Sequence, residues 1–273
     1  MNLKEKLKQN KKNGQATLAT NFYNFETLSA VLTAAKNENS SLILQLSESS
    51  IKYLGLSTAI SMCRSLQKEY EVESWLHLDH GSDMNLIKKS IDLGFDSVMI
   101  DASEKSMDEN IALTKEIVRY AESYNINVEG ELGYVAKLGQ SQSQLVFTQP
   151  EEAKYFVEMT GVDALAVAVG SAHGFYSQTP TLQIDLINKI NKITDASLVL
   201  HGGSGIPHDQ ILSAIQNGMT KINLATEIKN SFMLKLREVL GHNNEIDLRK
   251  VFPKATNAAV ELVTEKLQLI NYS

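Results

Sequence analysis

The chain has 273 residues, of which 43% are hydrophobic and 21% charged, and its formal net charge is −6. This composition is typical of globular proteins and excludes disordered, collagen-like and coiled-coil chains. The negative charge argues against a nucleic-acid-binding protein, because such proteins present a basic patch. No apolar stretch reaches the roughly 18 residues that a membrane span needs.

The N-terminal segment and the single cysteine bear on the compartment. Residues 1–12 carry five lysines and lack the apolar core of a signal peptide, so we predict a solvated first helix that ends near Gly14. Cys63 has no second cysteine to pair with, so the chain needs no oxidising compartment. We therefore expect a cytoplasmic protein with no nucleic-acid and no membrane partner.

Short aliphatic runs alternate along the chain with longer amphipathic segments. In those segments apolar residues recur every three or four positions, and several segments end in glycine, as helices with one buried face do. This alternation favours a parallel sheet covered on both faces. The predicted strands are residues 16–20, 41–46, 74–78, 97–100, 126–132, 164–169, 197–202 and 220–224.

The number of strands and the lack of a linker select one architecture. A doubly wound sheet more often has six strands or a boundary near its midpoint, whereas no proline-, glycine- or serine-rich break divides this chain. We predict one α/β domain over residues 1–273, a (β/α)8 TIM barrel with an N-terminal helix and a C-terminal helical extension at 254–269. The active site of such a barrel lies at the C-terminal ends of its strands.

Polar side chains follow nearly every predicted strand. A random scatter of polar residues would not produce this pattern, so it agrees with a barrel enzyme whose site lies at those ends. In chain order these residues are Asn21, Asn24, Ser47, Asp79, His80, Asp101, Glu131, His173, His201 and Asn223.

Three of the six histidines, His80, His173 and His201, lie at the ends of different strands. A barrel brings those ends around one mouth, so the three imidazoles can converge on one ion. Three protein nitrogens and an open position form the ligand set of a catalytic zinc site. His77 lies inside the third strand and is expected to be structural, and His208 and His242 are expected to be exposed.

Two roles are open for Asp79, which adjoins His80. A carboxylate beside a metal-bound oxygen is the usual proton acceptor, and a carboxylate that orients a ligating histidine is also common. The residues alone leave both roles open, and it is chiefly a family resemblance that favours the first one for Asp79. For Asp101 and Glu131 a supporting role is favoured over that of the base. Each is expected either to orient a metal ligand or to be a structural hydrogen-bond acceptor.

The Gly202–Gly205 segment follows the seventh strand and precedes a helix that begins at Pro207. Glycines let backbone amides approach an oxyanion, and TIM-barrel phosphate sites use the loops after strands seven and eight. Ser204 lies in this segment, and Asn223 and Thr226 end the eighth strand opposite it. We predict a phosphate site here.

A metal, a phosphate site and a carboxylate base define a narrow chemistry. The metal polarises a ketone while the base removes a proton from a hydroxyl across a C–C bond, which cleaves that bond in a retro-aldol step. The sequence therefore predicts a metal-dependent aldolase acting on a ketose phosphate.

Several motifs together are similar to the class II, zinc-dependent ketose-bisphosphate aldolases, and especially to the tagatose-bisphosphate branch. The likeness covers nearly the whole chain and is specific in combination. It rests on NFYNFET (21–27), HLDHG (77–81), VMIDAS (98–103), VEGELG (128–133), TGVDALAVAVGSAHGFYSQTP (160–180), LVLHGGSGIP (198–207) and KINLATEIK (221–229).

The resemblance implies roles for particular residues. It implies His80, His173 and His201 as zinc ligands and Asp79 as the group that handles the C4 hydroxyl proton. It places Ser47 toward the other half of the substrate, Asn24 among the residues around the site, and a monovalent cation such as Na⁺ or K⁺ near the phosphate loops. It also implies a homodimer or homotetramer. The residues implied for the phosphate of the dihydroxyacetone-phosphate half are Gly174, Gly202, Ser204, Asn223 and Thr226.

Two positions depart from the family pattern. Members usually continue the ELG segment with a Gly-Gly-x-Glu loop whose glutamate moves the C3 proton, but this chain has no carboxylate between Glu131 and Glu151. Many members also carry a lysine near the phosphate where this chain has Ser177, and close tagatose-type relatives carry it where this chain has Gln178. Both departures bear on substrate choice.

The main prediction is reversible cleavage of tagatose or fructose 1,6-bisphosphate to dihydroxyacetone phosphate and glyceraldehyde 3-phosphate. An aldolase for another ketose 1-phosphate with a different C6 substituent is the nearest alternative. A Schiff-base aldolase would need Lys221, which is expected to be structural or solvated. A zinc hydrolase leaves the phosphate site unexplained, and a non-catalytic sugar-phosphate-binding relative would bind without turnover.

Overall fold

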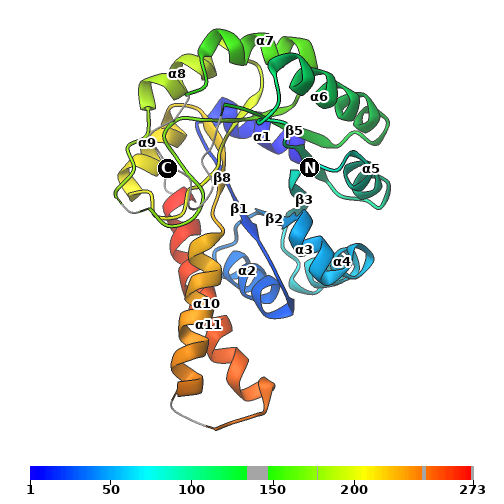
Figure 1. Cartoon of the computed structure of the whole chain (residues 1–273). Helices are drawn as coiled ribbons and strands as arrows, with labels where there is room; N and C mark the ends of the chain where they lie inside the picture. The colour runs from blue at the N-terminus through cyan, green and yellow to red at the C-terminus, as the bar shows by residue number, and fades with distance from the viewer. Residues whose placement is uncertain (134–146, 177, 242–243, 272–273) are drawn as a thin grey trace.

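The computed structural model describes residues 1–133, 147–176, 178–241 and 244–271. Within them, eight parallel strands close into a barrel in chain order, which confirms the predicted TIM barrel (Figure 1). The strands are β1 (Thr17–Asn21), β2 (Leu42–Ser47), β3 (Ser74–Gly81), β4 (Ser97–Ile100), β5 (Asn127–Leu132), β6 (Ala164–Val167), β7 (Ser197–Leu200) and β8 (Met219–Asn223).

Helices surround the barrel, and the first one ends as predicted. Gly14 terminates α1 in the left-handed conformation that glycine adopts readily. The helices are α1 (Leu3–Asn13), α2 (Phe25–Asn37), α3 (Glu48–Leu54), α4 (Leu56–Tyr70), α5 (Met84–Asp92), α6 (Met107–Ala121), a 3-10 turn η1 (Glu122–Tyr124), α7 (Pro150–Thr160), α8 (Ile184–Ile193), α9 (His208–Gln216), α10 (Thr226–Gly241) and α11 (Leu248–Asn271).

Two predicted boundaries are wrong by several residues. β3 continues three residues past 78, because an irregular register with β4 pairs Gly81 with Ile100. The C-terminal helix begins at Leu248 and not at 254, with Pro253 inside it. As the sixth residue of the helix, Pro253 has no N–H to donate and removes one hydrogen bond near its start. Helix α11 packs along α10 and α2.

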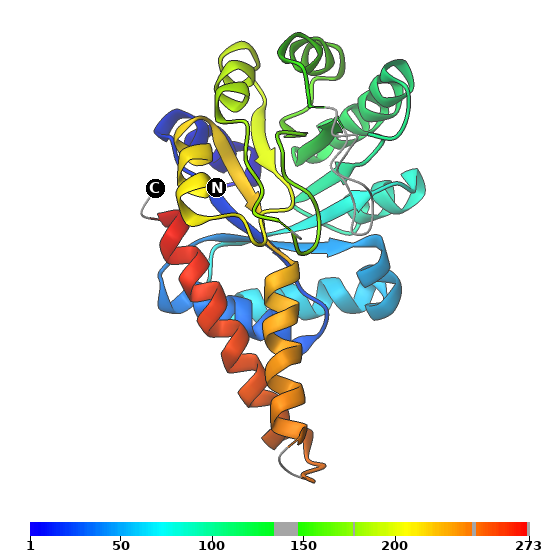
Figure 2. The same ribbon diagram turned by 60° about the vertical axis from the view of Figure 1, so that its left-hand side comes forward.

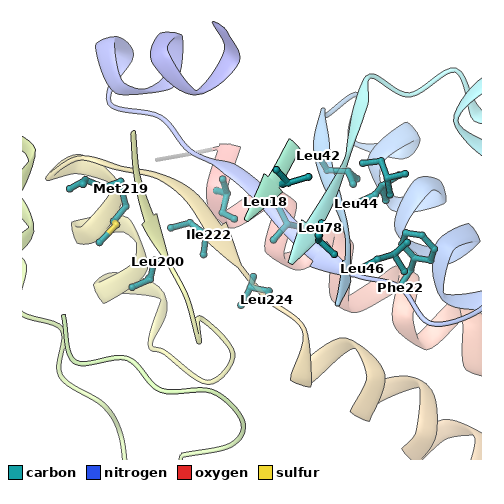
Figure 3. Close-up of a cluster of buried hydrophobic side chains, with 14 of the residues drawn as sticks. Leu18, Phe22, Leu42, Leu44, Leu46, Leu78, Leu200, Met219, Ile222 and Leu224 are labelled. Carbon is teal, nitrogen blue, oxygen red and sulfur yellow. The ribbon is translucent and has the colours of Figure 1, made fainter. Parts of the chain in front are cut away.

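The hydrophobic residues form two cores, one outside the barrel and one within it. The larger core lies between the strands and the surrounding helices and contains leucines from alternate strand positions, such as Leu42, Leu44 and Leu46 (Figure 3). The smaller core lies inside the barrel, where Leu3 and Leu7 of α1 join interior residues that include Trp75 and Ile43. Helix α1 therefore closes the N-terminal end of the barrel, and the prediction of a solvated helix is wrong for the face that carries Leu3 and Leu7.

Helices α10 and α11 run side by side and project from the barrel as a hairpin (Figures 1 and 2). Several large hydrophobic side chains of this hairpin are exposed: Met233, Leu234, Leu240, Ile246 and Leu248. Among the described residues, no helix combines the length and the apolar composition needed to cross a bilayer.

Candidate active site

Interior side chains change from apolar to polar along the barrel axis. Alternate residues of a barrel strand face the interior, so Trp75 in the apolar core is followed on β3 by His77 and then Asp79. The same alternation places Glu129 and Glu131 in the interior from β5. The C-terminal end of the barrel thus carries polar groups in successive layers.

The three predicted histidines meet at this end. The Nε2 atoms of His80 and His173 are 3.2 Å apart, and the ring centroids of His80 and His201 are 4.7 Å apart. One potential ligand atom from each of the three rings lies within 4.8 Å of the other two. His201 is fully buried, and the other two rings are partly exposed toward the mouth.

An irregular backbone lets Asp79 and His80 serve the same site although they are neighbours in a strand. Regular alternation would direct them to opposite faces. His80 has a φ of 51°, and the register with β4 shifts between Leu78 and Gly81. A bulge of this kind turns a side chain toward a functional site. Gly81 is required next to it, because a Cβ there would lie 2.6 Å from the Met99 carbonyl oxygen.

Carboxylates determine which ring nitrogens face the centre of the cluster. Asp101 Oδ2 lies 2.8 Å from His80 Nδ1, so Nε2 is the nitrogen left to face His173. Glu129 Oε1 lies 2.9 Å from His201 Nε2, and His201 Nδ1 makes no hydrogen bond with the described residues. Glu131 Oε2 is 3.5 Å from that Nδ1.

The electrostatics of the cluster favour a cation. Burial disfavours a charged His80 ring, yet Asp79 and the hydrogen bond to Asp101 raise the pKa of His80 to about 9. Burial, together with His80 and Lys221, holds the pKa of His201 well below its ordinary value, so that ring is neutral. A field that favours a proton on one ring favours a metal ion among all three for the same reason.

Asp79 is buried and held by amides from three other strands. Asn21 Nδ2 donates to its Oδ2 at 2.9 Å, and Gln45 Nε2 donates to its Oδ1 at 3.2 Å, with Asn223 Nδ2 at 3.5 Å. Burial acts to raise the pKa of Asp79, but His80, His201 and Lys221 lower it below its ordinary value. The carboxylate is therefore ionised and able to accept a proton.

The loops after β6 and β7 are joined by Tyr176. Its hydroxyl accepts from the Ala172 N–H at 2.8 Å and donates to the Gly202 carbonyl at 2.7 Å. Gly202 has a φ of 65°, and a Cβ there would overlap the Ala172 carbonyl oxygen, so only glycine fits. The loop of His173 and Gly174 is thereby fixed against the loop of His201.

The residues predicted to hold phosphate gather where these loops meet the start of α10. Ser204 is 3% exposed, and its Oγ accepts from the Glu227 N–H at 3.4 Å. Thr226 begins α10, and Asn223 ends β8. Free N–H groups at a helix start and in a glycine-rich loop are suited to binding an anion.

Comparison with known proteins shows which family the chain belongs to. The family model of class-II fructose-bisphosphate aldolase matches residues 1–273. The chain belongs to this family. It is therefore a lyase. The zinc-dependent retro-aldol reaction predicted from the sequence fits this family.

Individual relatives show the same likeness over the full length. The fructose-bisphosphate aldolase of Staphylococcus aureus strain Mu50 is 39% identical over 276 residues, covering 98% of this chain and 96% of that protein. The enzyme of that name from Geobacillus stearothermophilus is 38% identical with the same coverage. The crystal structure of the YdjI aldolase from Escherichia coli K12 superposes with a TM-score of 0.88 at 31% identity, covering 98% and 96% of the two chains.

Two other predicted residues of this aldolase have local structural roles. Ser47 lies at the end of β2 and caps α3, where its Oγ accepts from the Ser50 N–H at 3.3 Å. Asn24 caps α2, where its Oδ1 accepts from the Thr27 N–H at 3.0 Å. The segment 134–146, where family members usually carry the Gly-Gly-x-Glu loop, lies outside the described residues, and so do Ser177 and His242.

Sequence reasoning missed the buried residues behind the histidines. Glu129 was not recognised, although its spacing from Glu131 in a buried strand places both carboxylates on one face. Lys221 is fully buried, and its Nζ lies 2.7 Å from Glu129 Oε2, which agrees with a structural lysine. Tyr176 gave no sequence signal, because its role depends on how two loops approach each other.

Proposed function

We propose that this aldolase cleaves a ketose 1,6-bisphosphate, fructose or tagatose 1,6-bisphosphate, into dihydroxyacetone phosphate and glyceraldehyde 3-phosphate. The observation that carries the proposal is the meeting of three imidazoles with the ionised Asp79, beside a glycine-rich loop and a helix start. Relatives named fructose-bisphosphate aldolase support the substrate class.

We propose zinc as the metal, held by His80 Nε2, His173 Nε2 and His201 Nδ1. The donor set fits: two of these nitrogens are 3.2 Å apart, less than twice the roughly 2.0–2.1 Å of a zinc–nitrogen bond. The buried Nδ1 of His201, which has no hydrogen bond among the described residues, is the third donor. When bound, the zinc ion would polarise the C2 carbonyl and stabilise the negative charge that develops on its oxygen.

Asp79 accepts the proton of the C4 hydroxyl in this proposal. As that O–H bond breaks, the C4–O bond becomes the aldehyde carbonyl and the C3–C4 electron pair passes to the ketose-derived fragment. The amides of Asn21 and Gln45 hold the carboxylate in place by hydrogen bonds to its two oxygens. A fixed carboxylate needs no reorganisation when the proton moves.

The phosphate on C1 is held by backbone and neutral side chains. Gly174, Gly202, Ser204, Asn223 and Thr226 form this cradle from three loops that Tyr176 and the start of α10 hold together. We propose a monovalent cation, Na⁺ or K⁺, beside them. The buried Asn223 Oδ1, which makes no hydrogen bond within the described residues, is an available oxygen ligand.

A substrate panel tests the proposal directly. We expect the protein to contain about one zinc per chain and to cleave fructose or tagatose 1,6-bisphosphate, with chelation abolishing turnover and zinc restoring it. Borohydride in the presence of substrate should trap no imine. Failure on both bisphosphates with zinc present would overturn the substrate assignment.

One observation favours a second substrate class. The exposed Gln178 stands where tagatose-type relatives carry lysine, so a charge-assisted phosphate contact is absent there. This departure from the bisphosphate-aldolase pattern leaves a ketose 1-phosphate with a different C6 substituent as the alternative substrate. Steady-state kcat/KM across ketose phosphates with and without a C6 phosphate distinguishes the two classes.

We propose that the enzyme is a cytoplasmic homodimer or homotetramer. The exposed Leu234, Leu240 and Ile246 on the projecting α10–α11 hairpin support association, because water-exposed apolar side chains gain from burial in an interface. Sedimentation analysis should show a dimer or a tetramer, and Ile246→Glu should shift it toward smaller species. A wild-type monomer would contradict this proposal.

A further inference from the structure

A buried charged layer lies inside the barrel directly behind the three histidines. Lys221 of β8, Glu129 of β5 and His77 of β3 have side chains that are 0% exposed. Lys221 Nζ lies 2.7 Å from Glu129 Oε2 and 3.3 Å from His77 Nε2. These groups separate the apolar core closed by α1 from the histidines at the mouth.

Packing alone does not explain this layer. The interior layers of TIM barrels are dominated by branched aliphatic side chains, and well-packed apolar residues are often at least as stable as a buried ion pair. A charged layer therefore indicates a requirement other than stability. One contact joins the layer to the histidine cluster: Glu129 Oε1 lies 2.9 Å from His201 Nε2. This contact indicates that the layer supports the histidines.

The donors and acceptors of the layer allow one arrangement of protons. An ammonium group only donates, so Lys221 donates to Glu129 and to His77 Nε2. His77 then carries its proton on Nδ1 and donates to Ser97 Oγ at 2.7 Å. Glu129, an acceptor at both oxygens, requires the proton of His201 on Nε2.

This arrangement leaves the Nδ1 lone pair of His201 directed at the centre of the histidine cluster. The other tautomer would place a lone pair against the Glu129 carboxylate and a proton where a metal ion has to bind. Lys221 neutralises Glu129 in the buried interior of the barrel, and His77 and Glu129 together fix the ammonium group. A chain of polar contacts thus joins His77 of β3 to Lys221 of β8 and Lys221 to Glu129 of β5.

We propose that Glu129 and Lys221 are a positioning pair for the metal site: they hold His201 in the tautomer and orientation in which Nδ1 is the ligand atom. Carboxylates that receive the second N–H of a ligating histidine act in this way in metal proteins generally. The proposal deepens the proposed function, because it rests on His201 being a metal ligand, but it makes no assumption about the sugar substrate.

Two matched double variants separate positioning from charge burial. Glu129→Leu/Lys221→Met replaces the ion pair by apolar side chains and leaves His201 Nε2 without an acceptor. Glu129→Gln/Lys221→Met also removes both charges, but the amide oxygen can still accept from that N–H. Both variants lack the Lys221 ammonium group that donates to His77 Nε2. The acceptor for the His201 N–H is therefore the main difference between them.

Zinc affinity, measured against a competing chelator, is the readout. We expect Glu129→Leu/Lys221→Met to bind zinc about 10- to 100-fold more weakly than wild type, the range found for partners of metal ligands. Glu129→Gln/Lys221→Met should remain near the wild-type affinity. Equal affinity in both variants and in wild type would overturn the proposal, and so would an equal loss in both.

A measurement on the unaltered chain covers the case in which a variant fails to fold. Long-range ¹H–¹⁵N correlation spectra of the metal-free protein should show His201 protonated at Nε2 and unprotonated at Nδ1. Protonation at Nδ1 would overturn the positioning role. A wild-type protein that binds no zinc, yet shows the expected tautomer, would refute the proposed metal site and leave the Glu129 contact standing.

Discussion

The two ends of the barrel interior use opposite chemistry. At the N-terminal end, Leu3 and Leu7 of α1 pack with Trp75 and Ile43 in an apolar core. At the C-terminal end, polar side chains are held by partners with a defined donor or acceptor, as Asp79 is held by Asn21. The first end tolerates changes of shape at a cost in stability, while the second responds to the loss of single atoms.

This difference predicts how substitutions at the two ends should separate. Changes at the N-terminal end should lower the free energy of unfolding and leave the activity of folded molecules unchanged. Changes at the C-terminal end should alter metal binding, turnover or substrate binding at a smaller cost in stability, because active-site polar groups are retained for function more than for stability. The predictions below begin with the largest effect.

His173→Ala should give the largest loss. Removing one of three ligands should weaken zinc binding by more than the roughly 100-fold that is the upper end for partners of ligands, and should abolish measurable cleavage. Metal analysis after gel filtration and a cleavage assay measure both effects. His208→Ala is the matched control, since His208 is about half exposed on α9 and pairs with Glu265. Wild-type zinc content in His173→Ala would contradict the site.

Asp79→Asn should lower kcat by about 10²- to 10⁴-fold, the usual contribution of a positioned general base, with zinc content retained. The substitution keeps the size of the side chain but replaces the carboxylate by an amide, which is too weak a base to accept the proton. It also sets an amide N–H₂ against Asn21 or Gln45, so stability should fall slightly. Measuring kcat and zinc content together separates this variant from His173→Ala. Unchanged kcat would exclude Asp79 as the base.

The outer parts of this site were readable from the sequence. The strand ends that carry Asp79, His80 and His201 follow from periodicity, because the ends of parallel barrel strands share one mouth. The adjacency of Asp79 and His80 was readable, but not the bulge that lets both face the site, since a left-handed φ at a histidine leaves no pattern in the sequence.

The supporting contacts were not readable, for a different reason. Glu129 and Lys221 lie 92 positions apart, and their pairing follows from barrel closure and register, which periodicity does not specify. The hydroxyl of Tyr176 joins two loops whose path depends on tertiary packing. Sequence reasoning thus located the polar groups at the mouth of the barrel better than the groups that hold them in place.

Leu7→Ala should destabilise the core at the N-terminal end of the barrel without changing the catalytic rate of the folded enzyme. Leu7 is fully buried between α1 and the barrel, and its truncation should cost about 2–5 kcal/mol of unfolding free energy, as leucine-to-alanine changes in cores do. Urea unfolding measures the loss, and kcat per folded molecule should not change. Lys8→Ala, at an exposed position of the same helix, is the control. A large loss of kcat in Leu7→Ala would mean that the two ends are coupled.

Tyr176→Phe should have the smallest effect and is the most sensitive test of the comparison. It removes one hydroxyl and leaves the Ala172 N–H and the Gly202 carbonyl without their partner, at a cost of about 1–3 kcal/mol for groups that stay buried. Burial raises the pKa of Tyr176 to about 12, so the hydroxyl is neutral at every pH used in an assay and its loss removes hydrogen bonds but no charge. Because the hydroxyl fixes the loop of Gly174 against that of Gly202, we expect KM for the sugar phosphate to rise several-fold while kcat and zinc content stay near wild type. A selective fall in kcat would place Tyr176 among the groups that act on the reacting atoms.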